Sequence, residues 1–145
     1  MRRAFLLLLL GLWLPAFLAL PAWSAELRVQ VNDPQNRNGV MRFALYDHAA
    51  GFPTYKGRVA HLDVPLPKAG HVEALFADLA PGSYAVAVYH DENANNEFDQ
   101  GFLGFPLEGY GFSNDARGFL SAPSFASAAV RLGEEGLTIQ LRLSY

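Results

Sequence analysis

Cysteine is absent from this 145-residue chain, so the fold can use no disulfide, no thiolate metal site and no lipid-modified cysteine anchor. Basic clusters are absent as well, and 11 Lys and Arg stand against 14 Asp and Glu. Nucleic acids and anionic lipids attract proteins through concentrated positive charge, which this chain does not offer. We therefore expect neither nucleic acid nor a membrane surface as a partner of the mature protein.

One long hydrophobic run is present, and it lies at the N-terminus. Two arginines precede twenty residues without a charge, 4–23, which is the charged start and apolar core of a signal peptide. Small residues at Ala22 and Ser24 predict cleavage after Ser24 or Ala25. An uncleaved membrane anchor is the alternative, since about twenty apolar residues can span a bilayer. We expect a protein that is exported to the periplasm or secreted.

Removal of the predicted signal peptide, residues 1–24, leaves one domain, residues 25–145. About 120 residues suffice for one core that buries roughly two-thirds of the unfolded surface. The domain keeps nine Lys and Arg against 14 acidic residues, a formal charge of −5. A second domain is not needed to account for the length.

Apolar and polar residues alternate with a period of two along most of this domain, as in half-buried β-strands. The alternation is clearest near the two ends, in 26–31 and 138–145. Further strands, bounded by turn residues, are predicted at 40–46, 59–66, 71–76, 83–89 and 126–132. The sequence therefore predicts an all-β fold, an antiparallel β-sandwich of about seven strands.

Turn residues predict which of these strands are joined. Asn38-Gly39 lies between the first two strands and is a hairpin signal. Residues 67–70 are expected to pair strands 59–66 and 71–76 in the same way. The segment Gly101–Gly118 is rich in glycine and aromatic residues, which predicts an irregular loop rather than a strand.

The stretch "HDENANNEFD", 90–99, holds four acidic and three amide side chains in ten residues. It carries the D-x-[DN]-x-[DN] spacing of calcium loops, in which alternate side chains turn inward to offer oxygens. Asn96 occupies the position that needs a left-handed backbone, and Phe98 is expected to anchor the loop. The predicted metal ligands are Asp91, Asn93, Asn95, Glu97 through its carbonyl, and Asp99.

A solvated turn is the alternative interpretation of this stretch, because Asn and Asp also dominate turns that bind no metal. The bidentate Glu of an EF-hand is missing, since Phe102 stands at its position. With two carboxylates at ligand positions, any calcium affinity should lie in the weak range of extracellular modules, roughly 10⁻⁴ to 10⁻³ M. A lone histidine, His90, favours a hydrogen-bonding residue over a transition-metal ligand.

The glycine- and aromatic-rich segment is the second candidate site. Its aromatic side chains could form a shallow surface beside the acidic loop, suited to a sugar or a peptide. The candidate ligand-binding residues are Phe102, Phe105, Glu108, Tyr110, Phe112 and Asn114. Alternatively, the segment is an Ω-like loop whose aromatic residues plug one end of the core while Glu108 and Asn114 hold its backbone.

Three linked motifs resemble those of the exported bacterial family of unknown function 2141. They are "LAPGSYAVAVYHD", "HDENANNEFD" and "LGFPLEGYGFSNDA", followed by a P-x-F strand. The resemblance extends over the whole mature chain. The resemblance implies an immunoglobulin-like or transthyretin-like β-sandwich and implies no activity. The chain departs from the family pattern at Asn96, where glycine is usual. The matching motif positions are His90, Asp91, Asn93, Asn95, Asp99, Gly104, Pro106, Glu108, Gly111, Phe112, Ser113 and Asn114.

Two classes of function remain. The first is an exported binding or accessory module of the cell envelope, with a weak structural calcium loop and a glycan, peptide or protein as its partner. The second is a small envelope hydrolase that uses Asp91 and Asp99 as an acid and base pair. A serine nucleophile is not favoured, because Ser83 and His90 point to opposite faces of one strand and no G-x-S-x-G motif is present. We expect a binding module and no enzyme.

Overall fold

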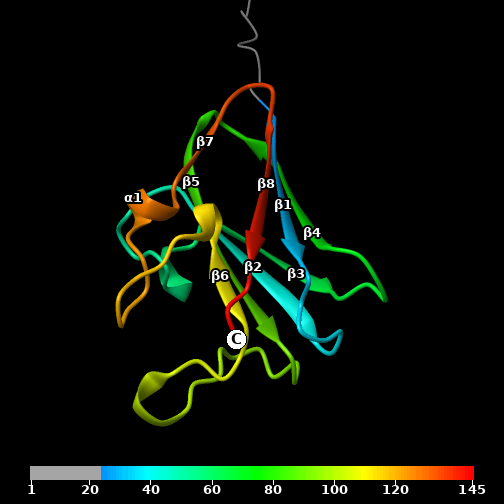
Figure 1. The fold of residues 1–145 in the computed structure, drawn as a ribbon. Coiled ribbons are helices and arrows are strands. Elements are labelled where there is room, and N and C mark those ends of the chain that lie inside the picture. The colour runs from blue at the N-terminus through cyan, green and yellow to red at the C-terminus, as the bar shows by residue number, and fades with distance from the viewer. Residues whose placement is uncertain (1–23) are drawn as a thin grey trace, which may run out of the picture.

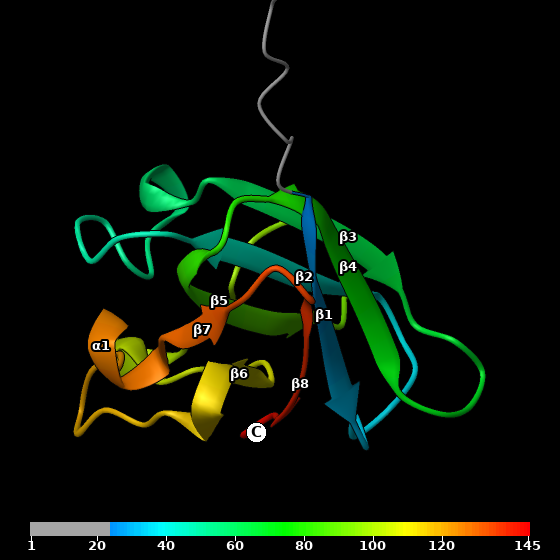
Figure 2. The ribbon, with the colours of Figure 1, turned by 90° about the horizontal axis from the view of Figure 1, so that it is seen from above.

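The structure is a computed structural model that describes residues 24–145, so nearly all of the predicted signal peptide lies outside the described residues. Its strands form two sheets that pack face to face (Figure 1). Seen from above, the strands of one sheet run across those of the other (Figure 2). None of the helices in the described part of the chain has the length and apolar character needed to cross a membrane. The predicted all-β sandwich is confirmed.

The smaller sheet has three strands and the larger has five. The smaller is ordered β4 (Val72–Leu79), β1 (Ala25–Asn32) and β8 (Leu137–Arg142). The larger is ordered β3 (Ala60–Pro65), β2 (Val40–Tyr46), β5 (Gly82–Asp91) and β6 (Tyr110–Phe112), and β7 (Val130–Leu132) also pairs with β5. The helices are short, namely η1 (Tyr55–Gly57), η2 (Phe102–Gly104), η3 (Ser113–Asp115) and α1 (Phe125–Ala128).

The core lies between the two sheets and follows from the alternation in the sequence. On β1 every second residue, beginning with Ala25, is buried. On β2 the inward side chains are Met41, Phe43 and Leu45. Strand β5 is covered on both faces, as its sequence predicts, because Ala85 is buried in a second, smaller cluster with Phe112. The side chains that remain on the outer face of β2 and β5 form the floor of the candidate site.

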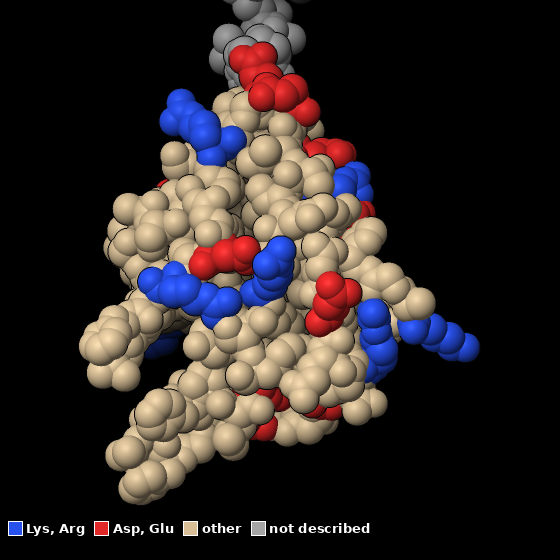
Figure 3. All heavy atoms as spheres, in the orientation of Figure 1, with Lys and Arg blue, Asp and Glu red and all other residues tan. Residues whose placement is uncertain are grey.

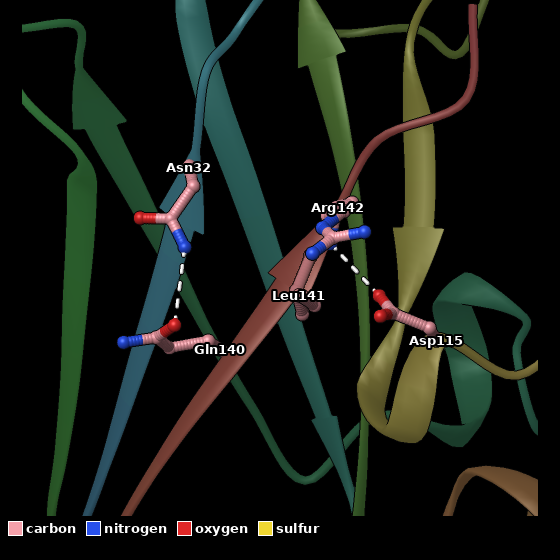
Figure 4. A pocket seen from close by; sticks show the side chains of 5 residues that line it. All are labelled: Asn32, Asp115, Gln140, Leu141 and Arg142. Atoms are coloured by element: carbon pink, nitrogen blue, oxygen red, sulfur yellow. Dashed lines mark hydrogen bonds between the residues drawn. The ribbon is translucent and has the colours of Figure 1, made fainter.

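One pair of strands departs from the antiparallel arrangement. Strands β1 and β8 run parallel, with Gln30 opposite Gln140 and Asn32 opposite Arg142. Asn32 Nδ2 donates to Gln140 Oε1 over 3.3 Å across these strands (Figure 4). A parallel pair needs a long crossover connection, and here most of the domain lies between the two strands. Local turn signals could not reveal this pairing.

Both predicted hairpins are wrong. The strands on either side of Asn38-Gly39 lie in different sheets, and so do those on either side of residues 67–70. Gly39 has a φ of 67° and lies so close to the end of β5 that an added Cβ would be 1.9 Å from the Asp91 carbonyl oxygen. The glycine is therefore used for a close approach between loop and strand, a role that turn statistics do not separate from a hairpin.

Two boundaries also differ from the prediction. Residues 126–132, predicted as a strand, begin inside α1, and only Val130–Leu132 pair with β5. Ser124 caps that helical turn by accepting from Ser127 N over 3.2 Å, so a local hydrogen bond decides the conformation. The segment Gly101–Gly118 is not wholly irregular, because β6 forms within it and pairs with β5.

The parallel register can be tested with paired cysteines, because the chain has no thiols of its own. Residues opposite one another on neighbouring strands are about 4.8 Å apart, which is within disulfide range. We expect Gln30→Cys with Gln140→Cys to form an intramolecular disulfide under mild oxidation, as measured by thiol titration and mass spectrometry. Gln30→Cys with Arg142→Cys is the control, since an offset of two residues places these positions about 8 Å apart. Faster oxidation of the control pair would contradict the register.

Candidate functional site

An ion pair on the outer face of the larger sheet organises the acidic loop. Arg42 on β2 donates from Nε to Asp91 Oδ2 over 2.6 Å. The Asp91 side chain is fully buried, whereas that of Arg42 is 13% exposed. The other two nitrogens of Arg42 donate to Asp63 Oδ2 and Asn96 Oδ1, each over 2.7 Å. Arg42 thus joins β2, β3, β5 and the loop that follows β5.

The surroundings of Asp91 stabilise its ionised form. Burial opposes ionisation, but the hydrogen bonds from Arg42 and from the backbone N–H groups of Asn96 and Asn95 outweigh it, so the pKa of Asp91 lies below its ordinary value. The donor distances are 2.9 Å for Asn96 N and 3.1 Å for Asn95 N. A carboxyl group held in this way stays ionised and has little capacity to give up or take a proton near neutral pH.

The rest of the loop is a series of side chain to backbone turns. Asn93 Oδ1 accepts from Asn95 N over 3.0 Å, and Asn95 Oδ1 accepts from Glu97 N over 2.8 Å. Asn96 has a φ of 68°, which confirms the left-handed conformation predicted for that position. Phe98 anchors the loop on the outer face of the sheet, with its ring centroid 5.4 Å from that of Tyr89.

Asp99 and Glu108 close the loop from the other side. The amide nitrogens of Asn93 and Asn95 donate to the Asp99 carboxylate over 2.7 to 3.2 Å. Glu108 is nearly buried and accepts from Glu92 N over 3.2 Å and from Asp99 N over 3.1 Å, so it joins the two ends of the loop. Burial raises the pKa of Glu108 despite these two backbone donors.

The five predicted metal ligands lie in one loop, but the charge of one of them, Asp91, is already balanced by Arg42. Among the residues the structure describes, no group of three or more His, Asp and Glu is placed to hold a metal ion. The positive charge beside Asp91 already comes from Arg42, which leaves Asp99 as the carboxylate of the set without an ion pair to a described residue. The backbone turns suit a calcium loop and the low free charge suits only a weak one.

His90 belongs to the framework rather than to the site. Its side chain is fully buried, with Nε2 2.7 Å from the Asn38 carbonyl oxygen and Nδ1 2.9 Å from the Tyr145 hydroxyl. These partners account for both ring nitrogens, as expected for a histidine that bonds within the fold. His90 thereby joins β5 to the connection between β1 and β2.

A groove of about 1110 Å³ lies beside the acidic loop, on the outer face of the larger sheet. The side chains on its floor are short, because Ala44 on β2 and Ala87 on β5 stand directly opposite one another. Aromatic rings continue the lining from the loop to β6, with Phe98 and Tyr110 centroids 6.0 Å apart and Tyr110 and Phe112 centroids 6.2 Å apart. The size matches or slightly exceeds that of small-molecule sites, about 300–1,000 Å³.

Two loops project beside the groove, and we refer to them as finger 1 (residues 100–107) and finger 2 (residues 116–122). In the space-filling view they are two protrusions without charged side chains at their ends, separated by a gap (Figure 3). Finger 1 is closed by backbone hydrogen bonds from Gly101 N to Phe105 O over 2.8 Å and from Leu107 N to Asp99 O over 2.9 Å. The fingers therefore offer apolar surface on both sides of the groove.

Each finger contains the same tripeptide, Gly-Phe-Leu, which lies at 101–103 in finger 1 and at 118–120 in finger 2. The leucines have left-handed backbones, with φ of 62° at Leu103 and 56° at Leu120. All four side chains are exposed, at 87% for Phe102, 77% for Leu103, 91% for Phe119 and 85% for Leu120. The leucines line the groove and the phenylalanines do not. Exposed leucines in a strained backbone conformation are uncommon and mark the fingers as a candidate functional feature.

The far end of the groove carries a positive charge. Arg58 is half-buried, and its guanidinium carbon lies 3.4 Å from the centroid of the Tyr55 ring. No salt bridge joins Arg58 to another residue of the described chain. Arg42, by contrast, is paired with both Asp91 and Asp63. The groove is therefore cationic at the Arg58 end and neutral to acidic at the Arg42 end.

The six predicted ligand-binding residues divide into three groups. Phe105, Tyr110 and Phe112 line the groove, whereas Phe102 lies at the end of finger 1, outside the lining. Glu108 holds the acidic loop, as described above. Asn114 donates from Nδ2 to the Ala129 carbonyl over 2.8 Å and so holds the backbone next to α1. These last two residues have the bracing role that the alternative interpretation gave them.

Several lining residues were not predicted from the sequence. Arg42, Ala44 and Tyr46 alternate with the inward residues of β2, so the period of two could have placed them together on the outer face. The repeated Gly-Phe-Leu tripeptide can also be read directly from the sequence. Nothing local indicates that Arg58 and Leu120 approach the same groove, because that depends on how distant loops fold over the sheet.

A second hollow, of about 210 Å³, lies between β8 and η3 (Figure 4). Its polar groups bond to one another, as in the contact from Arg142 N to Asp115 Oδ1 over 2.9 Å. The hollow is small, so we assign no role to it.

A model of the bacterial protein family DUF2141, described as "Uncharacterized protein conserved in bacteria", matches residues 29–140. The match spans β1 to β8 and includes the acidic loop and both fingers. No curated protein and no solved structure shows a significant match to the chain.

The buried ion pair predicts a pH-dependent contribution to stability. We expect Asp91→Asn to lower the free energy of unfolding at pH 7 by about 3 kcal/mol, because it leaves Arg42 without its buried partner. The pKa of Asp91 is depressed in the folded state, so this contribution is present above the unfolded pKa of about 3.9 and is lost as the pH falls through the lower folded value. Urea unfolding of both proteins at pH 7 and near pH 3 measures the difference.

Asp63→Asn is the matched control. It removes the other carboxylate that contacts Arg42, but the Asp63 side chain is 46% exposed, so we expect a loss below about 1 kcal/mol. An equal loss in the two variants would contradict the central place of Asp91, as would a wild-type advantage that stays constant down to pH 3.

Proposed function

The chain belongs to the DUF2141 family, and for this member we propose a binding function: an exported accessory module of the bacterial envelope that holds a ligand in the groove between the two fingers. The observation that carries the proposal is the groove itself. A sheet face with alanines at its centre, a row of aromatic rings and two exposed apolar loops presents far more apolar surface than folding requires.

The arrangement of the fingers supports the same proposal. Apolar side chains left in water at both loop ends carry a cost that burial against the sheet would remove. The backbone of finger 1 is nevertheless held out from the sheet by its own hydrogen bonds. A ligand that lies between the fingers covers Leu103 and Leu120, which line the groove, without any change in the fold of the sandwich.

The alternative, a hydrolase that uses Asp91 and Asp99, is less well supported. Asp91 is fully buried and paired with Arg42, which suits a structural anion better than a general acid or base. Asp99 accepts two side-chain amides of its own loop. Neither carboxylate lines the groove, whereas a catalytic pair must flank the bond that it cleaves.

We expect the neutral fluorescent dye Nile red to bind the mature protein with enhanced emission, because the dye reports apolar sites. Ala44→Phe places a ring on the outer face of β2, where it occupies the floor of the groove, and should weaken dye binding at least tenfold. Thr138→Phe adds the same ring to the outer face of the other sheet and should leave binding unchanged. Dye binding that is insensitive to Ala44→Phe would place the site elsewhere and count against the proposal.

We propose further that the acidic loop binds calcium weakly, with a structural role. Support comes from the predicted spacing, the left-handed Asn96 and the turns that direct Asn93, Asn95 and Asp99 toward one another. Because Arg42 already neutralises Asp91, the loop has little charge left to hold a divalent ion. The affinity expected of such a loop is about 10⁻³ M.

Thermal melting with added calcium tests this second proposal. At about 5 mM calcium and a dissociation constant near 1 mM, binding to the folded state adds about 1 kcal/mol. For a domain of this size, that raises the melting temperature by roughly 3–5 °C. Asp99→Asn should abolish the rise and Glu97→Gln should keep it, since the Glu97 side chain is exposed and its proposed ligand is the backbone carbonyl. No rise in the wild type, or an equal rise with magnesium, would identify a solvated turn.

A further inference from the structure

From the charge and lining of the groove we infer the class of its ligand: a small amphiphile with an anionic head and an apolar, acyl-like body, whose head binds Arg58 and whose body lies between Leu103 and Leu120. The inference rests on the proposed binding function and narrows it. Two of the three residues that carry it, Arg58 and Leu120, lie outside the motifs.

The floor of the groove favours a body without hydrogen-bonding groups. Strands β2 and β5 are interior strands, so their backbone N–H and C=O groups are already used in pairing with neighbours on both sides. On β2 and β5 the side chains above them are Arg42 at one end and otherwise alanine and tyrosine, whereas the polar lining residues His61 and Asp63 lie on β3. A glycan or a peptide that crosses Ala44 and Ala87 would bring hydroxyl or amide groups that lose water over these alanines without gaining partners there, at a cost of about 1–3 kcal/mol each. An acyl chain loses no hydrogen bonds on entering.

The distribution of charge favours an anionic head at one end. Arg58 has no carboxylate partner among the described residues and is already oriented by stacking on Tyr55. At the opposite end, Arg42 is shared by Asp91 and Asp63, so that end repels an anion or is neutral to it. A guanidinium that is half-buried and free of a local anion is suited to bind a carboxylate of the ligand.

The length of the groove suits an acyl chain of moderate size. The lining residues of β2 run from Arg42 to Tyr46, which is about 13 Å at roughly 3.3 Å per residue. Finger 1 adds Leu103 and Phe105 to the apolar surface, and finger 2 adds Leu120. The two leucines contribute side chains to the groove from separate loops, so both are expected to contact the same ligand.

The test compares two amphiphiles with the same twelve-carbon tail and opposite head charge, both well below their micelle concentrations. Isothermal titration of the mature protein should detect dodecanoate binding at least tenfold tighter than dodecyltrimethylammonium. Arg58→Gln should remove most of that difference, whereas Arg131→Gln, at an exposed position of β7 outside the groove, should preserve it. Maltotriose and a neutral apolar tripeptide amide serve as glycan and peptide probes and should not bind.

The two Gly-Phe-Leu tripeptides supply a matched pair of variants for the apolar part. Leu103→Ala with Leu120→Ala should weaken binding of both amphiphiles at least fivefold. Phe102→Ala with Phe119→Ala removes similar exposed side chains that do not line the groove and should change neither affinity. Circular dichroism and melting of each variant identify any that fails to fold, and the Phe pair shows what removal of the finger ends does by itself.

The outcomes separate the inference from the proposed function. Equal affinity for the two head charges, or full affinity in Arg58→Gln, would overturn the anionic head while Nile red binding still supports a groove. Binding of maltotriose or the peptide, blocked by Ala44→Phe, would replace the ligand class and keep the binding function. An affinity loss in the Phe pair equal to that in the Leu pair would move the contact to the finger ends and overturn the inference. Failure of Nile red and of every other probe would count against both.

Discussion

The ion pair between Arg42 and Asp91 is the constraint on which the functional face depends. Asp91 ends a strand that is covered on both sides, so its charge has no access to water and must be balanced within the protein. Arg42 balances it from the neighbouring strand and extends to Asp63 and Asn96. The same contacts fix one end of the groove and the start of the acidic loop. A stable charge pair here also leaves Arg58 as the arginine of the groove that is available to a ligand.

The groove exists because small residues lie where two strands are paired. With Ala44 opposite Ala87, the sheet surface is lower than its aromatic surroundings, and the fingers raise the sides further. The hollow therefore does not require a gap in the core, which is packed on the opposite side of the same strands by Phe43, Val86 and Val88. The larger core cluster and the groove use opposite faces of β2 and β5, whereas the smaller cluster around Ala85 and the Arg42–Asp91 ion pair share the outer face with the groove.

Much of the fold could be predicted from the sequence, because alternation in single strands is a local property. The period of two correctly placed most strands, and the D-x-[DN]-x-[DN] spacing correctly predicted the left-handed backbone at Asn96. Pairing between strands was predicted poorly, since it depends on contacts far apart along the chain. The parallel pair of β1 and β8 and the two misassigned hairpins are examples. The same limit applies to the groove, where Arg58 and Leu120 meet through tertiary packing alone.

The buried polar residues of the motifs have a different task from the groove residues that lie outside the motifs. Asp91 and Glu108 accept backbone N–H groups that would otherwise be unpaired, and Ser113 Oγ accepts from Val86 N over 2.9 Å and donates to the Ala128 carbonyl. Each of these polar side chains is buried and fully engaged in holding β5, β6 and the loops together. Arg58 and Ala44, which determine the charge and depth of the groove, lie outside the motifs. The motifs therefore specify the scaffold and part of the apolar lining, whereas the charge and depth of the groove depend on side chains outside the motifs.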